Sequence, residues 1–138
     1  MAEDPICSPF SPSVINTFTE HIDKAISSST IVLSSNIQKH FSPDGKTLYL
    51  KGSLIFLDSS VLEIALFVIE THDALTIEKY RFHYMKPQRQ MLFRYDNAPH
   101  HPEITSHPHH KHISENVIPS RELSLNDVLD EISAIIVG

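Results

Sequence analysis

The stretch "LTIEKYRFHYMKPQRQMLFRYD" (residues 75–96) alternates aromatic and charged side chains on both sides of a turn. This period of two predicts two strands, in which the aromatic side chains share one face and the basic side chains share the other. Residues 86–89 form the turn between them, so the strands are expected to pair antiparallel. Arg81, His83 and Arg94 would then project together from the open face of a sheet, because cross-strand neighbours lie within about 5 Å.

The segments that precede this hairpin predict more strands of the same sheet. Residues 47–57 and 61–70 alternate large apolar residues, and turn sequences at 42–46, 58–60 and 71–74 bound them. Residues 31–41 predict a further, short strand. The pattern therefore indicates one antiparallel sheet of four or five strands.

Amphipathic helices are predicted at both ends of the chain. "SPSVINTFTEHIDKAI" would begin with Ser11 as N-cap and Pro12 at the first helical position, and "SLNDVLDEISAIIV" would begin with Ser124 as N-cap. Both helices would pack on the apolar face of the sheet. The expected fold is therefore a two-layer α+β single domain (residues 1–138), with residues 1–10 as a flexible tail.

The composition predicts a cytoplasmic protein with a local anion-binding surface. The chain has 138 residues, a net charge of −6 and one cysteine, Cys7, so no internal disulfide is possible. No segment resembles a signal peptide or a membrane span. Residues 79–112 nevertheless carry a net positive charge, because their basic residues outnumber Asp96 and Glu103. The basic residues there are Lys79, Arg81, Lys86, Arg89, Arg94 and Lys111.

Six of the ten histidines lie between Arg94 and His112, in "RYDNAPHHPEITSHPHHKH". Prolines interrupt this stretch, so it is predicted to be neither a regular helix nor a central strand. We expect the loop from Ala98 to His112 to fold back over the open face of the sheet. The alternative is a solvated loop whose imidazoles lie far from the sheet.

Two chemistries fit such a cluster. A metal would use His107, His109, His110 and His112, but the stretch lacks both an HExxH motif and a cysteine partner. Acid–base chemistry on RNA needs no metal, because the 2′-hydroxyl is the nucleophile and histidine serves as base or acid. Arginine would stabilise the phosphorane-like transition state. No cofactor is expected under this interpretation.

The segments "KYRFHYM", "FRYDNAPHHPEI", "HPHHKHI" and "LNDVLDEI" resemble the TumE toxin family, and the resemblance runs from about Gly52 to the C-terminal helix. It implies the toxin half of a type II toxin–antitoxin pair, encoded beside a helix-turn-helix antitoxin. One departure is visible. Leu66 stands where the family pattern places an acidic residue near the middle of a strand.

The resemblance and the acid–base hypothesis together identify candidate site residues. Those predicted to act in catalysis are His83, Arg94, Asp96, His100, His101, His109 and His112. Those predicted to bind substrate are Tyr80, Arg81, Asn97, His110 and Lys111.

The leading hypothesis is a metal-independent ribonuclease held in check by an antitoxin. The alternatives are a non-catalytic module that binds nucleic acid or protein, and a zinc-, nickel- or manganese-dependent hydrolase at the histidine-rich loop. The expected partners are an RNA substrate and the antitoxin, without a membrane, and a homodimer is left open.

Overall fold

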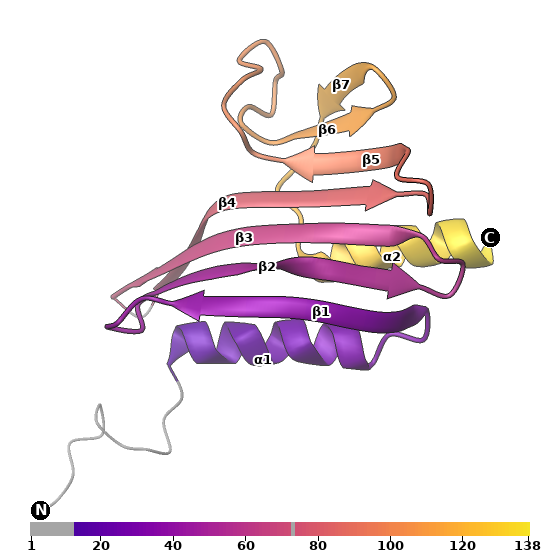
Figure 1. Cartoon of the computed structure of the whole chain (residues 1–138). Coiled ribbons are helices and arrows are strands. Elements are labelled where there is room, and N and C mark those ends of the chain that lie inside the picture. The colour runs from indigo at the N-terminus through magenta and orange to yellow at the C-terminus, as the bar shows by residue number, and fades with distance from the viewer. Residues whose placement is uncertain (1–12, 73) are drawn as a thin grey trace, which may run out of the picture.

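The computed structural model describes residues 13–72 and 74–138, which form a single antiparallel sheet with two helices (Figure 1). The elements are α1 (Val14–Ser27), β1 (Val32–Phe41), β2 (Thr47–Phe56), β3 (Val61–Thr71), β4 (Ala74–Met85), β5 (Met91–Asp96), β6 (His110–Ile113), β7 (Asn116–Pro119) and α2 (Leu125–Val137). The strands follow one another across the sheet in chain order. The α+β class and the antiparallel sheet were therefore predicted correctly.

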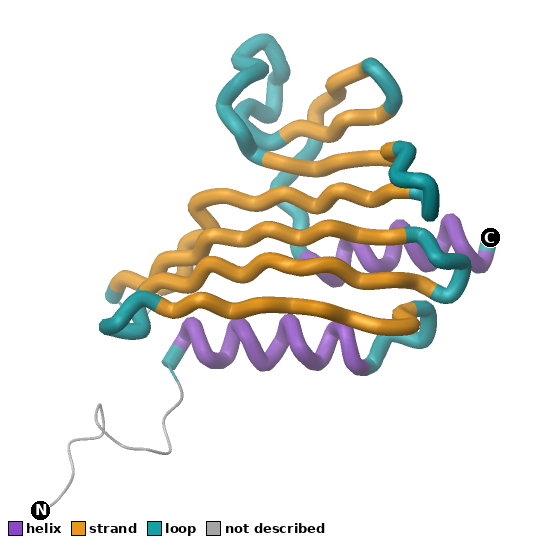
Figure 2. Tube along the Cα trace, in the orientation of Figure 1, coloured by secondary structure: helices purple, strands orange, loops and turns teal. Residues whose placement is uncertain are grey.

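The predicted number of strands was wrong, because the sheet has seven strands and not four or five. The additional strands are β6 and β7, which form a hairpin after the proline-containing loop (Figure 2). The hairpin extends the sheet because β6 pairs with β5. The histidine stretch thus enters an interior strand, although the prolines were expected to exclude one. Pro108 precedes β6 and Pro119 ends β7, so neither proline interrupts a strand.

The core lies between the helices and one face of the sheet. It joins the even-numbered residues of β2, β3 and β4 to the apolar stripes of both helices. The aromatic residues of the opening stretch belong to it, since Tyr80, Phe82 and Tyr84 are almost fully buried. No helix within the described residues is long and apolar enough to cross a membrane. The opposite face of the sheet is left to the basic and histidine side chains.

The two helix starts differ in how well the sequence predicted them. Ser124 is the N-cap of α2, as expected, and forms a capping box with Asp127. The helix α1 was predicted correctly but its N-cap was not, because the N-cap is Ser13, whose hydroxyl accepts from the Asn16 N–H. The buried carboxylate of Glu70 accepts from the Ile15 N–H at 3.0 Å. This hydrogen bond ties the start of α1 to the end of β3. The predicted tail with Cys7, together with Ser11 and Pro12, lies outside the described residues.

Gly52 is required where β1 and β2 approach closely. A Cβ at this position would lie 2.0 Å from the Asn36 carbonyl oxygen, a backbone atom that cannot move independently. We expect Gly52→Ala to lower the free energy of unfolding by about 1–3 kcal/mol in urea titrations. Ser53→Ala, at the next position, is the control and should change it by less than about 0.5 kcal/mol. Equal stability of the two variants would contradict this reading of the β1–β2 contact.

Candidate functional site

Two rows of polar side chains cross the open face of the sheet. In one row Arg81, Asp96 and His110 are partners on β4, β5 and β6. In the neighbouring row His83 on β4 pairs with Arg94, which pairs with His112 on β6. The predicted shared face of Arg81, His83 and Arg94 is therefore confirmed.

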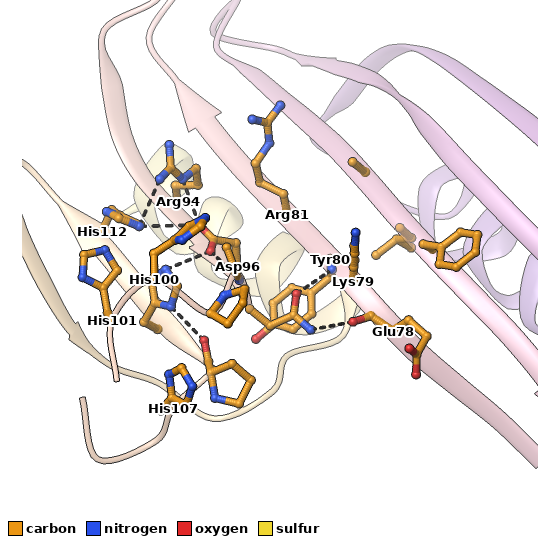
Figure 3. A pocket seen from close by; sticks show the side chains of 18 of the residues that line it. Glu78, Lys79, Tyr80, Arg81, Arg94, Asp96, His100, His101, His107 and His112 are labelled. Atoms are coloured by element: carbon orange, nitrogen blue, oxygen red, sulfur yellow. Dashed lines mark hydrogen bonds and ion pairs between the residues drawn. The ribbon is translucent and has the colours of Figure 1, made fainter. Parts of the chain in front are cut away.

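The loop between β5 and β6 folds back toward these rows, as predicted. The ring of His101, in the loop, lies 5.7 Å from that of His112 on β6, whose Nε2 is 3.0 Å from Nη2 of Arg94. Together the loop and the sheet enclose a cleft of about 1030 Å³. Its polar lining includes Lys79, Arg81, Arg94, Asp96, His100, His101, His107, His110 and His112 (Figure 3).

Asp96 is the centre of the hydrogen-bond network. Its Oδ1 lies 2.8 Å from Nε2 of His110 and accepts from the Ala98 N–H at 3.0 Å. Its Oδ2 accepts from Nε of Arg94 at 3.0 Å. The carboxylate is almost buried, at 7% exposure of the side chain, so these partners replace water. Asp96 thus holds Arg94 of its own strand, the start of the loop at Ala98 and the imidazole of His110 on β6.

His110 is buried with an oxygen acceptor at each ring nitrogen. Nδ1 lies 2.8 Å from the Pro108 carbonyl oxygen, and Nε2 faces the Asp96 carboxylate. A neutral imidazole carries one N–H and can donate to only one of them. Only a doubly protonated ring can donate to both acceptors, and the Asp96 contact is an ion pair in that state alone. With both nitrogens engaged, His110 holds the loop in place and does not exchange protons with a ligand.

His112 is held as a neutral imidazole. A guanidinium only donates hydrogen bonds, so Nε2 of His112 accepts from Arg94 and the ring proton lies on Nδ1. Burial lowers the pKa of His112 below its ordinary 6.5, and the Arg94 charge lowers it further, while Asp96 opposes both. A neutral ring with an available lone pair is the state that a general base requires.

His101 belongs to the same group of imidazoles. Its ring centroid lies 5.7 Å from that of His112 and 5.1 Å from that of His110. Nδ1 of His101 lies 3.2 Å from the Glu103 carboxylate, whose pKa is lowered by a hydrogen bond from its own backbone and by His101. An ionised Glu103 orients the His101 ring with a proton on Nδ1. The other ring nitrogen remains available for proton transfer.

Three imidazoles converge closely enough to be considered as metal ligands. One ring nitrogen from each of His101, His110 and His112 lies within 4.8 Å of the others, and this group differs from the predicted set because it contains neither His107 nor His109. A tetrahedral zinc ion, with Zn–N distances near 2.0–2.1 Å, holds its nitrogens about 3.4 Å apart. A metal bound through Nε2 of His110 would replace that nitrogen's contact with Asp96 and would place a dication beside Arg94.

His83 lies next to Arg94 but does not line the cleft. Its Nδ1 is 3.7 Å from the Glu63 carboxylate on β3, and its Nε2 is buried without a hydrogen-bond partner in the described structure. Burial lowers the pKa of His83, Glu63 opposes this, and Arg81 and Arg94 lower it further. The sequence analysis overlooked Glu63, although the alternation along β3 could have placed it on the open face. Leu66, by contrast, is 2% exposed and packs in the core.

Several predicted site residues support the fold from outside the cluster. Lys111 points to the helix side, where it contacts Glu131 of α2 at 2.7 Å and lies over the Tyr95 ring. The Tyr80 hydroxyl, whose pKa is raised mainly by burial, donates to Nδ1 of His109 at 2.8 Å. This contact separates His109 from the other imidazoles. These residues attach β6 and the loop to the core.

The remaining predicted residues lie along the loop. Asn97 accepts from the Tyr80 N–H and donates to the Glu78 carbonyl, both at 3.0 Å, which fixes the loop to the middle of β4. His100 and His107 are exposed and line the cleft. They provide imidazoles at its mouth, apart from the three that converge.

A comparison with protein families gives the chain an identity that agrees with its motifs. A family profile described as Toxin TumE matches residues 22–136, which include every strand, nearly all of α2 and the last part of α1. No curated protein and no solved structure showed a significant match. The chain therefore belongs to the TumE toxin family and is the toxin of a toxin–antitoxin system.

Proposed function

We propose that this toxin is a metal-independent ribonuclease whose active site is the cleft between β4–β6 and the histidine loop. The observation that carries the proposal is the contact between Arg94 and a neutral His112, with His101 beside them. This arrangement combines a base, a second proton-exchanging imidazole and a guanidinium in one cleft. Those are the groups that cleavage of RNA by its own 2′-hydroxyl requires.

The reaction follows from these positions. A phosphodiester displaces His112 from Arg94, so that the guanidinium binds the phosphate and the Nε2 lone pair faces the 2′-hydroxyl. His112 takes the hydroxyl proton while the 2′-oxygen bonds to phosphorus. The bond to the 5′-oxygen breaks, and protonated His101 gives that oxygen its proton. The products are a 2′,3′-cyclic phosphate and a free 5′-hydroxyl, with no change in oxidation state.

Arg81 and Arg94 stabilise the charge that builds on phosphorus. Arg81 faces the cleft from β4 and has no ion-pair partner within the described residues, so its guanidinium is available to an incoming phosphate (Figure 3). Asp96 holds Arg94 through Nε, which leaves the Nη groups directed at the substrate. In this proposal the two arginines stabilise the charge on the phosphate, and the imidazoles transfer the protons.

The cellular setting follows from the family. We propose a cytoplasmic toxin of a type II pair, restrained by a small antitoxin with a helix-turn-helix domain. The non-catalytic alternative is a module that uses the same basic cleft to bind nucleic acid or protein without turnover. Cleavage separates the two, because a binding module retains RNA but releases no product.

The test is cleavage of a short RNA oligonucleotide in the presence of EDTA. We expect full activity with the chelator, because the cleft supplies its positive charge from arginine and its proton transfers from histidine. A matched oligonucleotide with a single 2′-deoxy sugar at the cut site should remain intact, and the product should carry a 2′,3′-cyclic phosphate.

The rival interpretations predict other outcomes. Loss of cleavage in EDTA, restored by zinc, nickel or manganese, would establish the metal-dependent hydrolase. Cleavage of the 2′-deoxy oligonucleotide would exclude the 2′-hydroxyl as nucleophile. Tight binding of both oligonucleotides without any product would favour the non-catalytic module.

A further inference from the structure

We propose that Tyr49 and Phe67, on the open face beside the cluster of histidines and arginines, form a stacking platform for an unpaired base. The inference rests on the proposed function and deepens it, because it defines the substrate class as single-stranded RNA. Neither residue belongs to the motifs in the sequence, and neither takes part in the proton transfers. Both line the same cleft as Arg81 and Arg94.

The platform is a row of side chains across four strands. His40 on β1, Tyr49 on β2, Phe67 on β3 and Lys79 on β4 are successive cross-strand partners. The His40 and Tyr49 rings are stacked, with centroids 6.4 Å apart and an angle of 29°. Tyr49 is 41% exposed, which is unusual for a large side chain in the middle of a sheet. The helices cover the opposite face of the sheet, so this row faces the cleft.

Cations flank the aromatic side chains. Nζ of Lys51 lies 5.9 Å from the centre of the Tyr49 ring, and Lys79 ends the row at β4. The next row contains Lys51, Ala65 and Arg81 as cross-strand partners. Aromatic rings among basic side chains are the combination that proteins use for single strands, where rings stack on bases and cations contact phosphates.

The spacing connects the platform to the proposed site of cleavage. Phe67 and Lys79 lie one row from Arg81 and two rows from Arg94, and each row is two residues along a strand, or about 6.6 Å. Ala65 lies between the platform and Arg81, and its small side chain leaves the floor of the cleft open. A nucleotide whose phosphate contacts Arg81 thus has its neighbouring base within reach of Phe67, with Tyr49 on the next strand.

This geometry discriminates between single strands and duplexes. A base in a duplex is already stacked and paired, so it presents no free ring face to the platform. In a single strand the base turns outward and stacks on Tyr49 without giving up a pairing partner. Stacking is also tolerant of sequence, since every base has an aromatic face.

The experiment measures binding without cleavage, using a fluorescein-labelled single-stranded DNA that lacks the 2′-hydroxyl. Tyr49→Ala and Phe67→Ala are each expected to raise Kd by about 5- to 150-fold, as for the loss of one base–aromatic stack. Tyr49→Phe, which keeps the ring, should bind as the parent does. Phe41→Ala removes an exposed ring of β1 outside this row and serves as the matched control, with Kd unchanged.

The outcomes separate the platform from the catalytic proposal. Unchanged Kd for folded Tyr49→Ala and Phe67→Ala would overturn the platform, even if RNA is cleaved. Preferential cleavage of double-stranded RNA would overturn it as well. Ring-dependent binding of the DNA, without any cleavage of RNA, would support the platform and contradict the ribonuclease.

Discussion

His112→Asn is expected to lower kcat/KM for RNA cleavage by about 10²- to 10⁴-fold while the protein stays folded. The asparagine oxygen can still accept the hydrogen bond from Arg94, so the guanidinium keeps its position. What is lost is a group that can hold a proton from the 2′-hydroxyl. Initial rates with a fluorogenic RNA, together with thermal unfolding of both proteins, measure the two parts of this expectation.

The pH profile gives a second readout for the same residue. Burial and Arg94 lower the pKa of His112 below 6.5, so the neutral base persists to a lower pH than a free histidine allows. The acidic limb of kcat/KM should therefore lie below pH 6.5, and His112→Asn should remove it. His21→Asn, on the exposed surface of α1, is the control and should preserve both rate and profile. A folded His112→Asn protein with the parent's rate would exclude His112 as the base.

The central part of the fold was predictable, because local sequence and tertiary packing agree there. Between Lys79 and Tyr84 the period of two sets the face of each side chain, and the turn at 86–89 fixes the antiparallel pairing that places His83 opposite Arg94. A short connection between each pair of strands leaves a meander as the simplest order. Ser124 and Asp127 likewise identify the start of α2 from four residues of sequence.

The β6–β7 hairpin was not predictable in the same way. Its strands have four residues each, and β6 reads "HKHI", which has a single β-branched residue and no alternation of apolar and polar residues. It forms because Asp96 and Arg94 on β5 provide partners for His110 and His112. These contacts depend on how β6 aligns with β5 in the sheet, and the sequence of β6 alone does not predict that alignment.

The candidate site was partly predictable for the same reason. The sequence indicated which polar residues gather near the hairpin, but it did not separate residues that face the cleft from those that hold the loop. Lys111 and His112 are neighbours in β6, and the alternation of the strand sends Lys111 to Glu131 and His112 to Arg94. Once β6 is known to be a strand, this division follows from its period.

Asp96→Ala is expected to give the largest loss of stability, about 3–5 kcal/mol, because it leaves His110 and Arg94 without their shared carboxylate. Urea unfolding measures this loss. Asp23 provides the matched control, since it pairs with Lys39 at 2.6 Å but is 56% exposed. Removing a solvated ion pair of this kind should cost no more than about 1 kcal/mol.

A double-mutant cycle tests whether His110 is the residue that makes Asp96 indispensable. Asp96→Asn keeps the shape of the side chain but no longer offers two carboxylate oxygens, and His110→Asn removes the imidazole. If the two groups form a buried ion pair, the losses should be non-additive, with a coupling energy above about 1 kcal/mol. Additive losses would mean that the stability contributed by Asp96 comes from Arg94 and the Ala98 N–H instead. The loop would then be held at its first residue, without a charged contact to β6.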